Sequence, residues 1–253
     1  MIALEDQEQE QDEEAQQDGQ QFLEACDHGD LEGVRFLVIN SSASVINFQG
    51  KVGGNTPAIR CCIHGHTEIL EYLLELGADA EMAASDGRTP LHFAVDHNSS
   101  DCVKLLLRYG VNAGVATNFG CTALHFAAQK NREECVPLFL SIGIGVSVDA
   151  ITAMFGRTAL WCASKNGHLS IVQLLVKGGA DIERADINGK TAIRIARENG
   201  HAAVAKYLDM ENKWQRRGSF ILATLSIKYE EPLTPTVRAL QCQDVARQIS
   251  LFL

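Results

Sequence analysis

The sequence predicts an all-α solenoid of stacked helix-turn-helix units joined by β-turn fingers. The main observation is a repeat, because Thr-Pro-Leu-His-Phe-Ala at 89–94 returns as Thr-Ala-Leu-His-Phe-Ala at 122–127. Related runs begin at Thr56, Thr158 and Thr191, so successive Thr residues are 33, 33, 36 and 33 positions apart. A repeat of this length is typical of solenoids, in which each unit packs on its neighbours, rather than of a single globular core.

Each copy carries the start and stop signals of two short helices. A glycine stands two positions before each Thr, which favours a β-turn: Gly54, Gly87, Gly120, Gly156 and Gly189. The Thr itself is a good helix cap, and Pro57 or Pro90 is tolerated in the first turn that follows. Nine positions after the Thr stands a residue that accepts a left-handed turn: Gly65, Asn98, Asn131, Gly167 or Gly200. Paired large apolar residues such as Leu73-Leu74 then predict the buried face of the second helix.

Together these motifs resemble the ankyrin repeat family over residues 20–209. The resemblance implies a protein-binding module without enzymatic activity, in which the imidazoles of His92 and His125 bond neighbouring turns. It also implies that a partner contacts the fingertips and the exposed turn of each first helix. By position, the central part of that surface is formed by Arg88, Asp96, His97, Asn118, Phe119, Gln129, Lys130, Met154, Phe155, Arg157, Lys165 and Asn166.

The chain divides into three parts on composition and pattern. Residues 1–19 are mostly Glu, Gln and Asp and are expected to be a disordered acidic tail. Residues 20–211 form the repeat domain, with a first unit that lacks the Thr signal, as in a capping repeat, and a loose loop at 39–55. Residues 212–253 are too apolar for a free tail and are expected to form helices that either cap the stack or dock a second protein.

Charge and cysteine content narrow the function and the compartment. The net charge is −10, and the first 20 residues hold eight acidic residues and no basic ones, so the repeats are nearly neutral. We therefore expect no nucleic-acid binding, which requires a basic surface. The eight cysteines are mostly spread along the repeats, which favours reduced thiols in a cytoplasmic or nuclear protein. We also expect no membrane span and no signal peptide.

The fourth unit departs from the regular pattern. Pro137 lies within the expected second helix at 132–141, where it predicts a kink. The link that follows, 143–155, carries three extra residues and ends in an apolar tip at Met154-Phe155. Irregular units in a regular array are places to look for function, although sequence drift also produces them.

The chain offers few candidates for chemistry. Cys61, Cys62, His64 and His66 have the residue types of a zinc site. In the repeat register, however, the two cysteines take the positions of small helix residues, and His66 aligns with two other histidines after a turn glycine. Catalytic triads and phosphate loops are not recognisable. We therefore predict no enzyme activity, no cofactor and no metal site.

The centre of the predicted binding surface has the composition of an interaction hot spot. Phe119, Met154 and Phe155 are large apolar residues at expected fingertips, and the basic residues Lys130, Arg157 and Lys165 flank them. The alternative is that these tips pack on one another. We expect a monomer that binds a protein segment with apolar and acidic residues. A second hypothesis is a substrate receptor of a ubiquitin ligase, in which residues 213–253 dock the adaptor.

Overall fold

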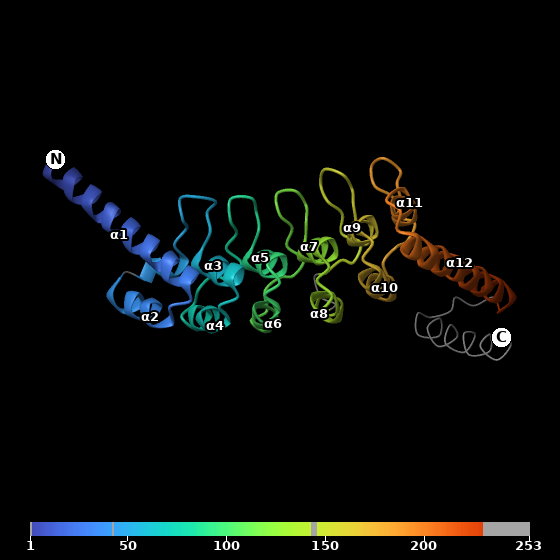
Figure 1. Ribbon diagram of the computed structural model, residues 1–253, viewed down its shortest axis with the longest axis horizontal. Helices are drawn as coiled ribbons and strands as arrows, with labels where there is room; N and C mark the ends of the chain where they lie inside the picture. Colours follow the sequence, from blue (N-terminus) through green and yellow to red (C-terminus); the bar gives the residue numbers. More distant parts are fainter. Residues whose placement is uncertain (1, 42, 143–145, 230–253) are drawn as a thin grey trace.

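The computed structural model describes residues 2–41, 43–142 and 146–229, which form an elongated row of helix pairs (Figure 1). The first helices of the regular units form an inner row: α3 (Pro57–His64), α5 (Pro90–Asp96), α7 (Ala123–Lys130), α9 (Ala159–Asn166) and α11 (Ala192–Glu198). The second helices form an outer row: α2 (Leu31–Asn40), α4 (Thr67–Glu75), α6 (Ser100–Arg108), α8 (Cys135–Ile142) and α10 (Leu169–Lys177). The long helices α1 (Ile2–His28) and α12 (Ala202–Tyr229) stand at opposite ends, and the fingers all project to one side.

The expected helix signals lie where the sequence predicts them. Thr56 Oγ1 accepts a hydrogen bond from the N–H of Ile59, and Thr158 Oγ1 accepts one from Trp161, so both side chains cap their helices. Gly65 and Asn131 end α3 and α7 with φ values of 76° and 57°, in the left-handed region. The solenoid of helix-turn-helix units is confirmed.

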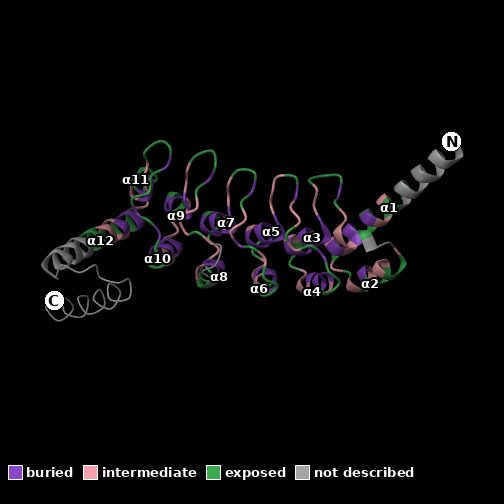
Figure 2. Ribbon diagram, turned by 180° about the vertical axis from the view of Figure 1, so that it is seen from behind, coloured by how far each residue is buried: buried purple, intermediate pink, exposed green. Residues whose placement is uncertain are grey.

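The core is one continuous layer between the two rows of helices (Figure 2). Leu70, Leu106 and Leu175 enter it from outer helices, while Leu124 and Leu160 enter it from inner helices, and all five are fully buried. Since neither row can bury its apolar face alone, the stability of each unit depends on contact with its neighbours.

The first unit differs from the regular units in the length of its first helix and in the burial of its second. Helix α1 begins at Ile2 and extends over the acidic segment, for which the disorder expected from composition stays a prediction. Glu, Gln and Ala have high helix propensity, so a segment that cannot form a core can still continue a helix. Phe22 is buried, but Phe36, which its apolar side chain predicts to be buried as well, lies on the outer surface with 65% of its area exposed.

The link at 39–55 also differs from the predicted loose loop. It contains a 3₁₀ helix, η1 (Ala43–Asn47), with Val45 buried in the core. Asn47 Oδ1 accepts a hydrogen bond of 2.8 Å from the N–H of Asp79, and Gln49 Nε2 donates one of 3.1 Å to the carbonyl of Ala83. These bonds to the next unit fix the link.

Pro137 does not kink a helix, because α8 begins later than expected. The helix starts at Cys135, whose N–H donates to the carbonyl of Arg132 at 3.1 Å. Pro137 therefore lies in the first turn, where backbone N–H groups have no partner within the helix. The expected helix at 132–141 has instead shifted toward the C-terminus.

The predicted boundary between 211 and 212 falls inside α12, so the last repeat and the start of the following segment form one continuous helix. Asn212 and Arg216 both bond the Glu183 carboxylate of the last finger. The rest of the predicted docking segment, 230–253, lies outside the described residues. In the part of the chain that the structure describes, helices are too short or too polar to cross a membrane.

The position of Pro137 makes a testable contrast with α10. Gln173 occupies the same place in its unit, fifteen residues after Thr158, but lies in the middle of α10. We expect Pro137→Ala to change the free energy of unfolding by less than about 1 kcal/mol, and Gln173→Pro to lower it by about 3 kcal/mol or more. Urea unfolding followed by circular dichroism measures both. A large gain in stability from Pro137→Ala would show that the proline strains α8.

Candidate functional site

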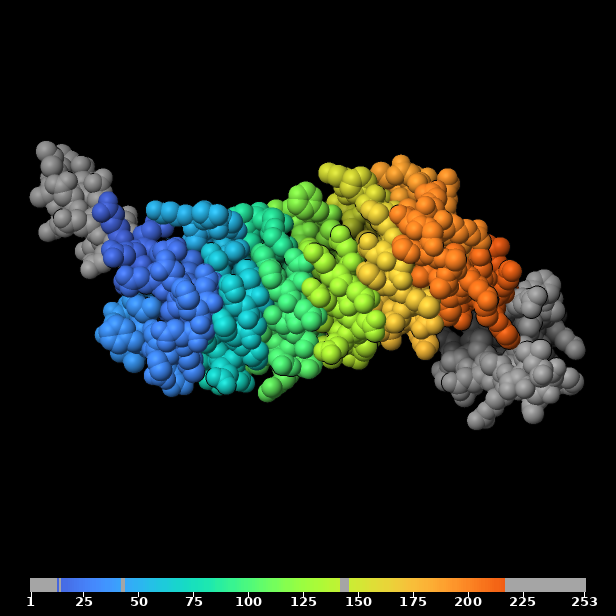
Figure 3. All heavy atoms as spheres, in the orientation of Figure 1, coloured from blue at the N-terminus to red at the C-terminus, as the bar shows by residue number. Residues whose placement is uncertain are grey.

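The fingers and inner helices form one continuous surface along the array, with successive units side by side (Figure 3). Adjacent fingers are joined by one backbone hydrogen bond each. The N–H of Asn118 donates to the carbonyl of Asp86 at 3.1 Å, and the N–H of Ala153 donates to the carbonyl of Phe119 at 2.9 Å. The N–H of Ile187 donates to the carbonyl of Phe155 at 3.1 Å. These bonds set the spacing of the fingertips.

Close contact between fingers requires glycine at their inner corner. Gly87 has φ +79°, and a Cβ there would lie 2.7 Å from the backbone nitrogen of Asn118. A side chain would therefore push the next finger away.

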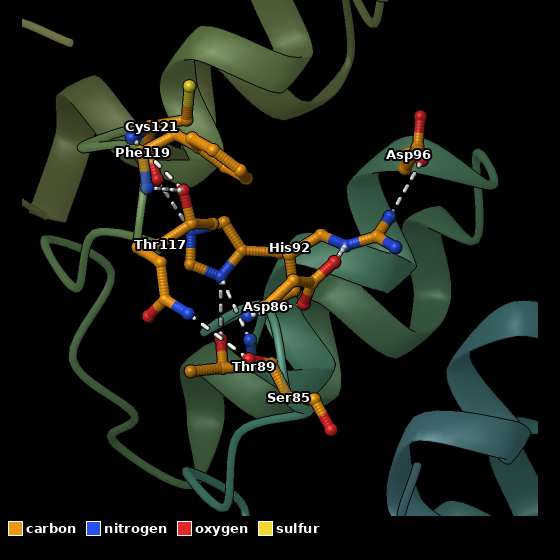
Figure 4. A network of polar contacts seen from close by, with 10 residues as sticks. Ser85, Asp86, Thr89, His92, Asp96, Thr117, Phe119 and Cys121 are labelled. Atoms are coloured by element: carbon orange, nitrogen blue, oxygen red, sulfur yellow. Dashed lines mark hydrogen bonds and ion pairs between the residues drawn. The ribbon is translucent and has the colours of Figure 1, made fainter. Parts of the chain in front are cut away.

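Buried histidines tie two fingers to the helices behind them, and Figure 4 shows the contacts of the first, His92. His92 Nδ1 accepts from the N–H of Thr89 at 3.1 Å and lies 2.9 Å from its hydroxyl. Nε2 must then carry the proton, and it donates to the carbonyl of Cys121 in the next finger at 3.2 Å. His125 repeats this arrangement with Thr122 and the carbonyl of Arg157. The predicted bonding of neighbouring turns by His92 and His125 is present in the structure.

Burial keeps both imidazoles neutral. It lowers the pKa of His92 from 6.5 to about 4, although the hydrogen bond to Cys121 O acts in the opposite direction. The pKa of His125 is lowered for the same reason. Because both ring nitrogens of His92 are already bonded, we assign these histidines a structural role.

The fingertip of the fifth unit is wider than its neighbours. In the fourth finger, the N–H of Gly120 closes the turn on the carbonyl of Thr117, three residues earlier. In the fifth, the N–H of Gly156 bonds the carbonyl of Thr152, four residues earlier. One residue of the long link is therefore placed in the fingertip, and Met154 is 60% exposed there.

A pocket of about 260 Å³ lies between the fourth and fifth units, bounded by their fingers and by α7 and α9. Seven of the residues predicted for partner binding line it: Phe119, Gln129, Met154, Phe155, Arg157, Lys165 and Asn166. The structure thus brings together the predicted residues of two adjacent units.

The remaining predicted residues lie away from this pocket. Asp96 is flanked by Arg88 and Lys130, with N to O distances of 3.5 and 3.3 Å, and Asp86 also pairs with Arg88, so these four charges compensate one another. His97 and Asn118 are exposed, and Asn118 Nδ2 bonds the carbonyl of Ser85.

The pocket wall includes residues that the sequence reasoning did not select: Cys121, His125, Thr152, Trp161 and Cys162. Trp161 is the important one, since it occupies the repeat position of His92 and His125 and is only 3% exposed. Its indole N–H has no hydrogen-bond partner among the described residues. The sequence does contain a feature that could have identified Trp161, because a tryptophan stands there in place of the histidine of the two preceding units.

The guanidinium group of Arg157 lies between two aromatic rings. Its Cζ atom is 4.3 Å from the ring centre of Phe155 and 4.2 Å from that of Trp161. Lys165 Nζ lies 5.7 Å from the Trp161 ring. The pocket therefore combines an aromatic wall with two cations, and the described residues that line it include neither Asp nor Glu.

Comparison with known proteins identifies the architecture. A family model described as ankyrin repeats (3 copies) matches residues 22–117, 77–150, 99–186 and 142–215. The chain belongs to the ankyrin repeat family. The search of curated proteins gave no match.

Two solved structures resemble the ankyrin repeat array closely. The ankyrin repeat domain of Bcl-3, a member of the IkappaB protein family, has a TM-score of 0.67 and 27% identity, covering 75% of this chain and 85% of that one. A chain from the complex of the predatory endopeptidase Bd0816 of Bdellovibrio bacteriovorus with the immunity protein Bd3460 has a TM-score of 0.65 and 29% identity. That match covers 75% of this chain and 97% of the other.

Burial governs the chemistry of the cysteines in the pocket and in α3. Burial raises the pKa of the Cys162 thiol to about 12, so this pocket residue is protonated at neutral pH and is a poor nucleophile. Cys61 and Cys62 are fully buried, and His66 Nε2 lies 3.1 Å from the carbonyl of Asp27. Among the residues the structure describes, no group of three or more His, Cys, Asp or Glu side chains is placed to hold a metal ion.

The low pKa of His92 predicts a loss of stability in acid. The unfolded chain takes up a proton near pH 6.5, whereas the folded chain resists protonation until about pH 4. Lowering the pH through this window therefore favours the unfolded state, by on the order of 3 kcal/mol once the pH is below 4. Urea unfolding across this window, for the wild type and His92→Gln, measures the effect as their difference. A difference that does not change with pH would contradict the assignment.

Proposed function

We propose that the chain binds a protein segment across its fourth and fifth units, with the pocket between them as the centre of the interface. The observation that carries the proposal is an exposed apolar cluster at the pocket mouth. Phe119, Met154 and Phe155 remain 59%, 60% and 38% exposed. Apolar residues gathered around a pocket and rimmed by charge are typical of protein-binding sites.

The contacts of these tips favour binding over mutual packing. Phe155 stacks on Arg157, while Phe119 and Met154 keep more than half of their surface in contact with solvent. If the three residues served mainly to cover one another, their exposed fractions would be smaller. Covering them with a partner segment would remove apolar area from water and so stabilise the complex.

The comparisons support the same general role. Ankyrin repeats are protein-interaction modules, and one similar chain comes from a complex between an endopeptidase and an immunity protein. We propose a partner segment that carries apolar and acidic residues, because the pocket presents aromatic rings and two cations. We further propose a monomeric, non-enzymatic protein that does not bind nucleic acid.

The state of the cysteines supports a cytoplasmic or nuclear location. The seven cysteines that the structure describes are free thiols, and five of them are buried. Free thiols persist in reducing compartments.

We expect the double substitution Phe119→Asp and Phe155→Asp to abolish partner capture with little loss of stability. Phe155 occupies the repeat position of Asp86, whose carboxylate lies 2.6 Å from Nε of the equivalent arginine, Arg88. An aspartate at 155 can therefore pair with Arg157, while two charges replace the apolar contact surface. Affinity purification with mass spectrometry identifies the partner, and thermal unfolding checks the fold.

The matched control is Val52→Asp, which places the same charge on the exposed tip of the second finger, far along the array. Partners that bind the central pocket should be retained by this variant. Equal recovery of a partner by the wild type and the double variant would remove the central pocket from the interface.

The second candidate is the substrate receptor of a ubiquitin ligase, and it is favoured by the helix that continues past the last repeat to Tyr229. We expect an adaptor to co-purify with the full chain and not with a chain that ends at residue 212. Recovery of an adaptor with both chains, or with neither, would contradict docking by residues 213–253.

A further inference from the structure

The basic residue before the capping Thr is neutralised in the same way in two units. In the third unit, Arg88 pairs with Asp96, seven residues after Thr89, at 3.5 Å. In the sixth unit, Lys190 pairs with Glu198, seven residues after Thr191, at 2.5 Å. The repeat thus provides a fixed place for a carboxylate next to this cation.

The fifth unit keeps the cation but reverses the charge of its partner. Arg157 stands before Thr158, and the residue seven positions after Thr158 is Lys165. The second carboxylate that contacts Arg88, Asp86, is also missing, because Phe155 takes its position. Both carboxylates of the third unit are therefore replaced in the fifth, one by a lysine and one by an aromatic ring.

Arg157 consequently has no counterion among the residues that the structure describes. Among the described residues it forms no ion pair within 4.0 Å, and its Nε is buried without a hydrogen-bond partner. Contact with the rings of Phe155 and Trp161 compensates part of the desolvation of the guanidinium group, but rings cannot accept its N–H hydrogen bonds in the plane of the group. The indole N–H of Trp161 is a further donor in the same wall that has no partner.

We propose that a Glu or Asp side chain of the partner segment binds in this pocket, with its carboxylate between Arg157 and Lys165. This carboxylate supplies from another chain what Asp96 supplies in the third unit and Glu198 in the sixth. The inference rests on the proposed function and specifies the chemistry of its partner. Phe119 and Met154, at the mouth of the pocket, contact apolar residues next to the acidic one.

Two observations indicate that the group bound in the pocket is a carboxylate: the charge of the pocket, and the ion pairs of the third and sixth units. The pocket combines two cations with unpaired N–H donors, so it favours an anion. In the third and sixth units the cation at the position of Arg157 is paired with a side-chain carboxylate, so a group of that size and charge is what this position binds elsewhere in the chain. The aromatic wall excludes water from the ion pair and strengthens it.

The test begins with random peptides displayed on phage and selected on the full-length chain. Peptides whose binding is lost in the Phe119→Asp, Phe155→Asp variant are synthesised, and their Kd is measured by fluorescence anisotropy. We expect an acidic residue at one fixed position beside apolar residues. Replacing it with Gln or Asn should weaken binding by about tenfold or more, as should Lys165→Glu, because each leaves a desolvated charge unpaired or repelled.

Lys165→Glu can also be tested without a partner, by measuring the thermal stability of the unbound variant. It restores the charge pattern of the sixth unit, so Arg157 gains a carboxylate and thermal stability should not decrease. Loss of binding together with an unchanged or higher Tm separates occupation of the site from unfolding. The matched control is Lys177→Glu, which makes the same charge change on an exposed residue of the outer helix α10 and should leave the Kd unchanged.

The outcomes distinguish the inference from the function on which it rests. If selection yields no peptide that depends on Phe119 and Phe155, the proposed binding surface fails, and the inference fails with it. If such peptides are found but show no acidic position, or bind Lys165→Glu as well as wild type, the binding surface stands and the carboxylate site is overturned.

Discussion

The hydrogen bond from each fingertip to the next is the interaction on which the geometry of the site depends. It recurs from Ser85 to Gly53, from Asn118 to Asp86, from Ala153 to Phe119 and from Ile187 to Phe155, at 2.9 to 3.1 Å. The buried histidines add a second tie between the third, fourth and fifth units. With backbone positions fixed in this way, a substitution at an exposed fingertip, unlike one at the glycine of the inner corner, changes the surface without moving the neighbouring fingers. The array therefore acts as a rigid frame for the residues at its fingertips.

Most of the fold follows from the sequence because each unit repeats the same local signals. Thr at a helix start, glycine or asparagine at a left-handed turn and paired leucines in the second helix are all local features, and they recur at a fixed period. The errors occur where a unit lacks a neighbour or where two signals compete. Helix α1 continues beyond its unit because helix propensity alone sustains it, and Pro137 shifts the start of α8 instead of bending it. Phe36 lies on the surface of the first unit, where the stack does not extend further to cover it.

The candidate site is harder to predict than the fold because position in the repeat does not show how a charge is compensated. Arg88, Asp96 and Lys130 occupy plausible binding positions, yet together with Asp86 they form a closed set of ion pairs. Arg157 occupies the same position as Arg88 and has no such partner among the described residues. The difference depends on residues eight positions apart that meet across one helix, and it becomes visible only when units are compared with each other. Trp161 was not predicted for a related reason, because it is unusual only when it is compared with the histidines at the same position of the third and fourth units.

The fifth unit also shows how an irregular repeat can gain a surface without losing its place in the stack. Its finger contains one more residue than the fourth, since Gly156 closes the turn on Thr152 across a wider loop. The bond from Ala153 to Phe119 and the bond from Ile187 to Phe155 are nevertheless kept, so the finger remains in register on both sides. The additional length is absorbed at the tip, where Met154 is exposed beside the pocket. Since insertions at a loop tip have a small effect on the free energy of folding, the array tolerates this change. Its hydrogen-bonded frame meanwhile holds Arg157 in a position where none of the described residues supplies a counterion.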